Sequence, residues 1–466
     1  MKKINRKIKN IRVIIFLLLT VIVLSACSSN NNNPNENGNN DGDPSQTYDL
    51  IWWNLFESEE VMQPLIDEYE SSNPNINIRY VQRTEGAESG DLIGDYRELL
   101  DENLTDNESL DTPDIITINN TWLGRYQQYL AASSSLTSAE IQSNYFSVIT
   151  KDFVRNNNVY AVPLSVDALA LISNTELMAQ ISAADSSGPV DSWFDFLDQA
   201  ERVTTRNENS INISGFAAGS SNVEFAMETI STIMMQSGID MASVDSLSGF
   251  SDAAVFADNA ESEVVLDYYK SYNSDFDIWD ESFNSEIAAF LSKKLVSFIG
   301  PSWRLNDIFR LNQTYSLGLN PEVFKMPQID PGNPDSNIYW ATYWGQAVTK
   351  DSQQRGQSAV AWDFIKFLSQ PEQLRKYNEL VRQQEGRNLD IIYPRIEMAQ
   401  EQKSDQYLSP YIESLEQADS WDMIDGFEVS NIFKEALASA SLNSDSIQSR
   451  INMEIIEQRT TLVSGP

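Results

Sequence analysis

The sequence predicts an α/β protein of at least two domains, the first of which contains a parallel β-sheet. Between residues 49 and 118, three segments typical of buried strands alternate with two segments of helical periodicity. That order favours parallel strands joined by helices. About 420 residues follow the N-terminal leader and linker, which is more than one hydrophobic core usually serves. We therefore expect further domain structure beyond the first sheet.

The elements of the first sheet are predicted from apolar runs and from the residues that bound them. Ser58 occupies an N-cap position and is followed by two acidic residues, which stabilise a helix start. Asn73-Pro74 ends this helix. Strands are expected at 49–53, 76–80 and 114–118, and a second helix is expected to include 97–104.

The same alternation continues towards the C-terminus. Residues 159–164 are expected to be extended. Strands are expected at 166–172, 211–216, 295–301 and, as a strand end, 347–349. Helices are expected from residue 193 to about 203 and at 223–235, 261–272, 303–311, 358–368 and 371–381. The proline-rich segment 321–334 is expected to be irregular, residues 238–258 form a loop region without a clear pattern, and the tail from residue 431 is expected to be helical.

The N-terminus predicts export and lipid attachment. A basic segment without acids precedes the apolar run Val13–Leu24, which is too short to span a bilayer and suits a signal peptide. The run ends in Leu24-Ser25-Ala26-Cys27, which resembles the lipobox of bacterial lipoproteins. This resemblance implies cleavage of residues 1–26 and a diacylglyceryl group on Cys27. The alternatives are an ordinary cleavable signal or a single anchor helix. Residues 27–47, rich in Asn and Gly, are expected to be a disordered tether.

Composition excludes several classes of function. The formal net charge is −36, and it becomes more negative if residues 1–26 are removed, because the charged residues of that segment are all basic. Nucleic acids are therefore excluded as partners, because phosphate contacts need clustered Lys and Arg. The chain has no histidine, which removes the common zinc sites and the Ser-His-Asp form of catalysis. A hydrolase that uses two carboxylates remains open.

The order of several short motifs resembles the extracellular solute-binding proteins of ABC importers, in the carbohydrate-binding group typified by maltose-binding protein. No single motif is specific, but their joint order across about 49–400 is. Ser173 and Thr175 depart from the Tyr-Asn-Lys that the family usually has at the first crossover. The matching segments are Leu50-Ile51-Trp52-Trp53, Ser72–Ile78, Thr112-Pro113-Asp114-Ile115-Ile116, Tyr160–Leu164 with Leu171–Asn174, Ser192–Leu197, Val296–Trp303, and Ala361–Leu368 with Gln370-Pro371-Glu372.

This resemblance implies a two-lobed fold, similar to periplasmic binding proteins, with a hinge and a ligand cleft between the lobes. Lobe 1 would comprise 48–163 plus 342–386, and lobe 2 would comprise 164–341 plus 387–466. It implies a monomeric receptor, not an enzyme, that has no cofactor or metal. The receptor would capture a carbohydrate, most simply an oligosaccharide, and deliver it to the transmembrane subunits of an ABC permease. It would act at the extracytoplasmic face of the cell membrane.

A sugar cleft needs aromatic rings against the C–H faces and polar groups for the hydroxyls. Ligands of open α/β sheets bind beyond the carboxyl ends of strands. Core packing is the alternative for each aromatic candidate. Asp167 alternatively pairs with buried backbone or an arginine, and Arg387 alternatively lies on the surface. The candidates chosen by these criteria are Trp53, Trp122, Asp167, Trp303, Trp340, Tyr343, Trp344 and Arg387.

Three other functions are compatible with the sequence. A receptor of the same fold that binds a polyamine, peptide or metal is one, and the acidity suits polyamines; Tyr268-Tyr269 is a weak hint of iron. A surface glycoside hydrolase or lyase would need two carboxylates about 5–10 Å apart, and no such pair stands out in the sequence. An adhesin or structural lipoprotein that has lost transport is the third.

Overall fold

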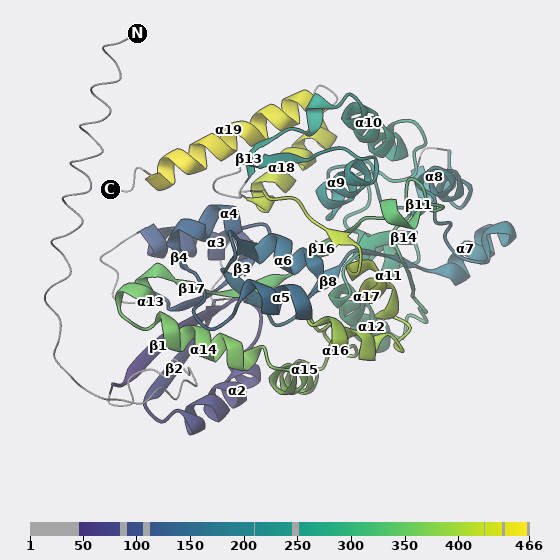
Figure 1. Cartoon of the computed structure of the whole chain (residues 1–466). Coiled ribbons are helices and arrows are strands. Elements are labelled where there is room, and N and C mark those ends of the chain that lie inside the picture. The colour runs from purple at the N-terminus through teal and green to yellow at the C-terminus, as the bar shows by residue number, and fades with distance from the viewer. Residues whose placement is uncertain are drawn as a thin grey trace, which may run out of the picture. The chain divides into compact units, whose positions relative to one another are not determined.

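The N-terminal strands belong to a mixed six-stranded sheet (Figure 1). The structure is a computed structural model, and it describes residues 46–83, 91–105, 112–208, 210–244, 251–423, 425–439 and 443–463. The order along the sheet is β2-β1-β3-β17-β4, and β7 also pairs with β17. β1, β2 and β3 are parallel, whereas β17 runs antiparallel to β3, β4 and β7. The strands are β1 (Tyr48–Asn54), β2 (Ile76–Gln82), β3 (Ile115–Asn119), β4 (Leu130–Ala131), β7 (Ala161–Pro163) and β17 (Trp344–Thr349).

Helices pack against this sheet through apolar stripes. In α2 (Glu59–Ser72) the buried side chains recur at helical spacing, from Val61 to Tyr69, and the helix ends at Asn73. Ser58 is at the N-cap position as predicted, but its side chain makes no capping bond to a backbone amide. The other helices of this region are α3 (Leu92–Thr105), α4 (Leu123–Tyr126), α5 (Ser138–Asn144), α6 (Ser147–Phe153), α13 (Lys350–Gln354), α14 (Ser358–Leu368) and α15 (Pro371–Glu385).

A second, five-stranded sheet has the order β10-β11-β14-β9-β15. β11 and β14 are parallel, and β9 runs antiparallel to both β14 and β15. Its strands are β9 (Ala170–Ser173), β10 (Thr205–Asn207), β11 (Ser210–Phe216), β14 (Leu295–Gly300) and β15 (Glu322–Phe324). The helices that accompany it are α7 (Thr175–Ile181), α8 (Trp193–Arg202), α9 (Ala226–Gln236), α10 (Glu261–Ser274), α11 (Glu286–Leu291) and α12 (Trp303–Tyr315).

The chain passes between the two large sheets through a small third sheet. β16 (Tyr339–Thr342) pairs antiparallel with β8 (Asp167–Ala168) and parallel with β18 (Ala418–Asp419). After α15 the chain continues through α16 (Ile396–Gln402) and α17 (Ser409–Leu415) into β18. It ends with α18 (Gly426–Ala438), which packs on α9, and α19 (Ser444–Val463), which packs on β13 (Ser251–Ala254).

The alternation predicted for residues 49–118 is confirmed by β1, α2, β2, α3 and β3. Three other expectations are wrong. The first sheet is mixed, because β17, β4 and β7 join it antiparallel. Residues 166–172 form two short strands, because β8 pairs with β16 whereas β9 pairs with β14 and β15. The segment 321–334 contains β15, which completes the second sheet beside β9. The unplaced segment 238–258 contributes a short antiparallel pair, β12 (Ala242–Val244) with β13.

The predicted signal peptide, Cys27 and nearly all of the predicted tether lie outside the described residues. Within the described residues, no helix has both the length and the apolar character that a membrane span requires.

Candidate functional site

The carboxyl ends of β1, β2 and β3 meet at one edge of the first sheet, and their following residues form one side of the candidate site. Asn54 ends β1 and Asn119 ends β3. β17 runs antiparallel and starts at Trp344, which pairs with Asn119, so Trp344 lies at the same edge. The turn after β3 is held by Asn119, whose Oδ1 accepts from the amide and the hydroxyl of Thr121 at 3.0 and 2.8 Å. This turn sets the position of Trp122.

Four aromatic rings form a continuous row at this edge, called here the aromatic row: Phe56, Trp344, Trp122 and Phe427. The ring centroids of successive members are 5.1, 5.0 and 6.0 Å apart. Phe56 is 37% exposed, and Trp344 and Phe427 are half-buried. The row therefore joins the loop after β1 to the start of α18 and keeps part of its ring surface accessible.

Trp122 is fully buried, yet its indole Nε1–H has no hydrogen-bond acceptor among the described residues. Trp53, which is 2% exposed, has the same unpaired donor within that part of the chain. An unpaired buried donor costs about 1–3 kcal/mol, so two of them near one sheet edge suggest a hydroxyl-bearing partner. The guanidinium carbon of Arg83 lies 3.6 Å from the centroid of the Trp53 ring, which leaves the Nε1–H of Trp53, rather than that ring face, for a ligand.

Trp303 and Asp167 lie close together on the second sheet's side. Trp303 begins α12 and is 41% exposed, with the guanidinium carbon of Arg304 at 4.3 Å from its ring centroid. Asp167 accepts from the amide and the hydroxyl of Ser302 at 2.9 and 2.7 Å, and from the amide of Ala168 at 2.8 Å. Burial raises the pKa of Asp167 to about 7. These hydrogen bonds match the alternative that Asp167 pairs with buried backbone. The bonds to Ser302 also fix the start of α12, where Trp303 lies.

Of the three candidates in the aromatic segment 339–344, two lie in the core and one lies at the candidate site. Trp340 is 2% exposed and belongs to the hydrophobic core. Tyr343 is also buried, and its hydroxyl donates to Asp152 Oδ2 at 2.6 Å. Only Trp344 of the three is partly accessible, because β17 starts there at the sheet edge.

Asp152 is the centre of a buried polar network. Besides Tyr343, its carboxylate accepts from the Asn120 amide at 2.9 Å and from the Ser420 hydroxyl at 2.5 Å. Burial raises the pKa of Asp152, and these three donors oppose that rise. The network ties α6, the turn after β3, the start of β17 and residue 420 to one carboxylate, so it determines where the residues of the aromatic row sit.

Arg387 is not free to act as a simple clamp in this structure. Its Nη2 lies 2.6 Å from Glu385, and its side chain is 25% exposed. Nearby, Glu57 of the β1–α2 loop accepts from the Tyr377 hydroxyl at 2.5 Å and from the Asn54 amide at 3.1 Å. Arg387 therefore belongs to an acidic cluster that adjoins the loop carrying Phe56.

A second set of buried polar atoms lies on α9 and α10. Glu228, in the first turn of α9, has an Oε2 without a donor among the described residues, and burial raises its pKa to about 7. The Tyr269 hydroxyl of α10 is also buried, and burial raises its pKa.

Sequence reasoning missed Phe56, Arg83, Phe427 and Glu228. Phe56 follows Trp53 by three residues in the loop after a parallel strand, so the same strand-end rule would have selected it. Arg83 directly follows β2 and was detectable in the same way. Phe427 gave no local signal, because only the tertiary fold brings the start of α18 to Trp122.

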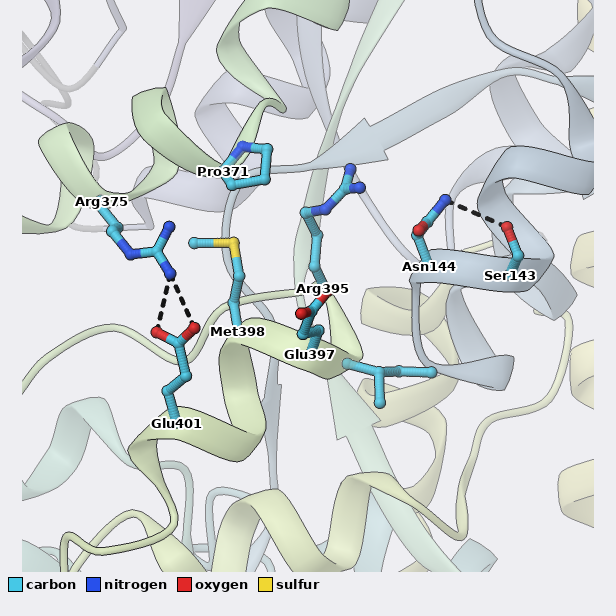
Figure 2. A pocket seen from close by; sticks show the side chains of 9 residues that line it. Ser143, Asn144, Pro371, Arg375, Arg395, Glu397, Met398 and Glu401 are labelled. Atoms are coloured by element: carbon cyan, nitrogen blue, oxygen red, sulfur yellow. Dashed lines mark hydrogen bonds and ion pairs between the residues drawn. The ribbon is translucent and has the colours of Figure 1, made fainter.

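A separate cavity of about 380 Å³ lies between α5, α15 and α16 and contains none of the candidate residues. Figure 2 shows Arg375 paired with Glu401 through two bonds of 2.8 Å, and Met398 between Arg375 and Arg395 in this view. The lining is charged and includes no aromatic ring, so it lacks the surface that a sugar face requires. The nine lining residues are Ser143, Asn144, Pro371, Arg375, Arg395, Ile396, Glu397, Met398 and Glu401.

Residues 56–374, more than half of the chain, match the family described as bacterial extracellular solute-binding protein. No curated protein matches the sequence.

Among solved structures, the sugar-binding protein MalE from Xanthomonas citri is similar at a TM-score of 0.66 and 15% identity, covering 90% of this chain and 100% of that one. The GacH receptor of Streptomyces glaucescens, solved without ligand and with acarbose, is similar at a TM-score of 0.63 and 16% identity. The match covers 90% of this chain and 100% of that one. A cyclo/maltodextrin-binding protein complexed with maltotetraose is similar at a TM-score of 0.65 and 15% identity. The match covers 91% of this chain and 99% of that one. At these identities the comparison establishes the two-lobed α/β fold expected from the sequence.

Proposed function

Because the chain belongs to the bacterial extracellular solute-binding protein family, we propose that it is a receptor that captures an oligosaccharide between its two lobes for an ABC importer. The observation that carries this proposal is the aromatic row, whose rings lie beside a buried indole donor without an acceptor in the described residues. Rings for sugar faces and unpaired donors for hydroxyls are the two elements that a carbohydrate site needs. The sugar-binding proteins of similar fold support the same assignment.

We assign lobe 1 to residues 48–163 plus 342–386 and lobe 2 to 164–341 plus 387–466. Sheet membership supports this division. All strands of the first sheet fall within the first pair of ranges, and all strands of the second sheet fall within the second. The small sheet of β8, β16 and β18 would then form the hinge. Lobe closure around the ligand would be a population shift driven by contacts that the ligand makes with both lobes.

Within this receptor, Trp344 and Phe56 of lobe 1 would stack on sugar rings, with Phe427 and Trp303 contributed by lobe 2. The fully buried ring of Trp122 would hold Trp344 in place through their edge contact. The Nε1–H groups of Trp53 and Trp122 and the carboxylate of Glu228 would bond hydroxyls. Asp167 and Tyr343 would position the site, through α12 and through Asp152 respectively. Trp340 would contribute to the hinge core, and Arg387 would orient the loop that carries Phe56. The residues described provide binding groups, and the proposed receptor has no catalytic step.

The proposed receptor would be held at the extracytoplasmic face of the cell membrane by lipid on Cys27, as the lipobox-like motif implies. Its partner there would be the transmembrane part of an ABC permease. Radiolabelled palmitate or glycerol should be incorporated into the wild-type chain in cells and not into Cys27→Ser.

A thermal unfolding panel tests the function directly. A ligand at about 100 times its dissociation constant stabilises a protein by about 2.7 kcal/mol, which raises the melting temperature by a few degrees in a chain of this size. We expect such a shift with one class of oligosaccharides. A shift only with polyamines, peptides or metal ions would replace the proposed ligand class, and no shift with any compound would contradict the receptor function.

A further inference from the structure

Residues 418–423 and 425–428, called here the strap, lead from β18 into α18 and carry an acidic side chain at every third position. Each of these acids contacts a cation of residues 97–155, in the proposed lobe 1. The four acids are Asp419, Asp422, Asp425 and Glu428.

The cations come from four different elements. Lys151 of α6 pairs with Asp419 and also donates to the carbonyl of Ser420 at 2.7 Å. The next two pairs follow along the strap. Arg155 of β5 (Val154–Arg155) lies 3.8 Å from Asp422, and Arg97 of α3 lies 3.0 Å from Glu428.

Asp425 is the centre of this set. Its side chain is 1% exposed, and its Oδ2 lies 2.6 Å from Arg97 and 3.4 Å from Nη1 of Arg125. Its other oxygen, Oδ1, accepts from the amides of Phe427 and Glu428 and so caps α18. One carboxylate therefore starts a helix and is bound to two arginines of another part of the chain.

Contacts other than ion pairs also hold the strap against lobe 1. The Ser420 hydroxyl donates to Asp152 at 2.5 Å. A Cβ atom on Gly426 would lie 2.5 Å from the Thr121 hydroxyl oxygen, so a larger residue here would force the strap or Thr121 to shift. The strap also contacts elements assigned to lobe 2. Trp421 donates to Ser231 of α9 at 3.3 Å, and α18 packs on α9. The strap thus connects one lobe to the other.

We propose that the strap and the four cations facing it form an electrostatic latch that favours the closed arrangement of the two lobes. The proposal rests on the proposed function, because a latch has a role only if the lobes open and close. The chain has 68 acidic and only 32 basic residues, and such an excess of one charge produces a net repulsion within the molecule. Four cations that face four acids across the two lobes therefore supply a local attraction against that net repulsion. In the proposed motion, the pairs of Asp422, Asp425 and Glu428, which lie beyond β18, separate when the lobes open.

The latch predicts a dependence on salt that ligand contacts alone do not. The Debye length falls from about 10 Å at 0.1 M to about 3 Å at 1 M ionic strength, and three of the four acids are partly exposed to solvent. Because the apparent affinity scales with the fraction of molecules in the binding-competent state, weakening the latch should raise the apparent Kd.

The experiment measures the distance between two labels in the full chain. The sequence has one cysteine, so a Cys27→Ser background with Asp67→Cys on α2 and Glu201→Cys on α8 carries only the two introduced thiols. Both positions are exposed and lie in different proposed lobes. Energy transfer is recorded without ligand and with the oligosaccharide selected by thermal unfolding, at about 0.05 M and about 1 M NaCl.

The latch variant neutralises all four acids, and a matched control neutralises four acids whose ion pairs lie within lobe 2. The single variant Asp425→Asn keeps the Oδ1 that caps α18 and removes the charge, so it separates latch from helix capping. The latch variant combines Asp419→Asn, Asp422→Asn, Asp425→Asn and Glu428→Gln. The control combines Asp277→Asn, Asp307→Asn, Glu416→Gln and Glu435→Gln.

We expect the unliganded latch variant to have a longer label distance than wild type at low salt, and its apparent Kd to rise about tenfold. Wild type at high salt should approach the variant, Asp425→Asn should lie between them, and the control should behave as wild type. Equal distances in wild type, Asp425→Asn and the latch variant would overturn the latch, as would an equal change in the control. If salt and the variants change the distance but no sugar does, the latch stands and the proposed ligand class fails.

Discussion

Replacement of Trp344 by alanine should weaken oligosaccharide binding by about 100-fold, which corresponds to about 3 kcal/mol. Trp344 is the central ring of the aromatic row, 5.1 Å from Phe56 and 5.0 Å from Trp122. Its removal takes away a stacking surface and loosens both neighbours, and aromatic pairs contribute about 0.5–1.5 kcal/mol beyond their buried area. Titration calorimetry gives the change in Kd.

Two further variants make this result specific. Trp344→Phe keeps a ring and should recover part of the affinity. Phe194→Ala removes another exposed aromatic side chain, 60% exposed on α8 and outside the row, and should leave Kd unchanged. An affinity for Trp344→Ala within about twofold of wild type, in a variant that still unfolds cooperatively, would remove the aromatic row from the binding site.

Replacement of Asp152 by alanine should lower the free energy of unfolding by about 4 kcal/mol. The change leaves three buried donors, from Tyr343, Asn120 and Ser420, without their shared acceptor. Each unsatisfied buried group costs about 1–3 kcal/mol. Urea denaturation measures the difference.

Asp152→Asn keeps one carbonyl oxygen as an acceptor and should lose about half as much stability. Asp307→Ala serves as the control, because Asp307 makes a partly exposed pair with Arg310, and surface pairs contribute at most about 1 kcal/mol. A loss below about 1 kcal/mol for Asp152→Ala would mean that the three donors find other acceptors.

Local patterns predicted residues 49–118 well because the elements of this segment are adjacent in sequence. Each strand of residues 49–118 ends in a marked turn, and each helix has an apolar stripe that can be recognised without knowledge of its partner. β15 was not predictable, because its three residues gain their strand pairing only from β9, about 150 positions earlier. The division of residues 166–172 into two strands depends in the same way on distant partners, because β8 pairs with β16 and β9 pairs with β14 and β15.

The residues of the candidate site also differ in whether a local pattern could select them. The strand-end rule selected Trp53, Trp122 and Trp303, which lie at or just after the ends of strands. It could not show that Trp340 and Tyr343 are buried while Trp344 is accessible, because that depends on which residue of the crossover starts β17. Nor could it select Phe427, whose position is set by the contacts of the strap with Asp152, Arg97 and Arg125.

Indole resonances test the central claim, that an oligosaccharide binds at the aromatic row. The ten tryptophans give ten Nε1–H signals after ¹⁵N-tryptophan labelling, and Trp344→Phe and Trp122→Phe assign the two that matter. A saturating oligosaccharide should shift the signals of Trp122 and Trp344. The signals of Trp193 and Trp362 should stay unchanged, because their donors already bond Gln236 and the carbonyl of Ala131. An oligosaccharide that binds and leaves both Trp122 and Trp344 unshifted would contradict the account.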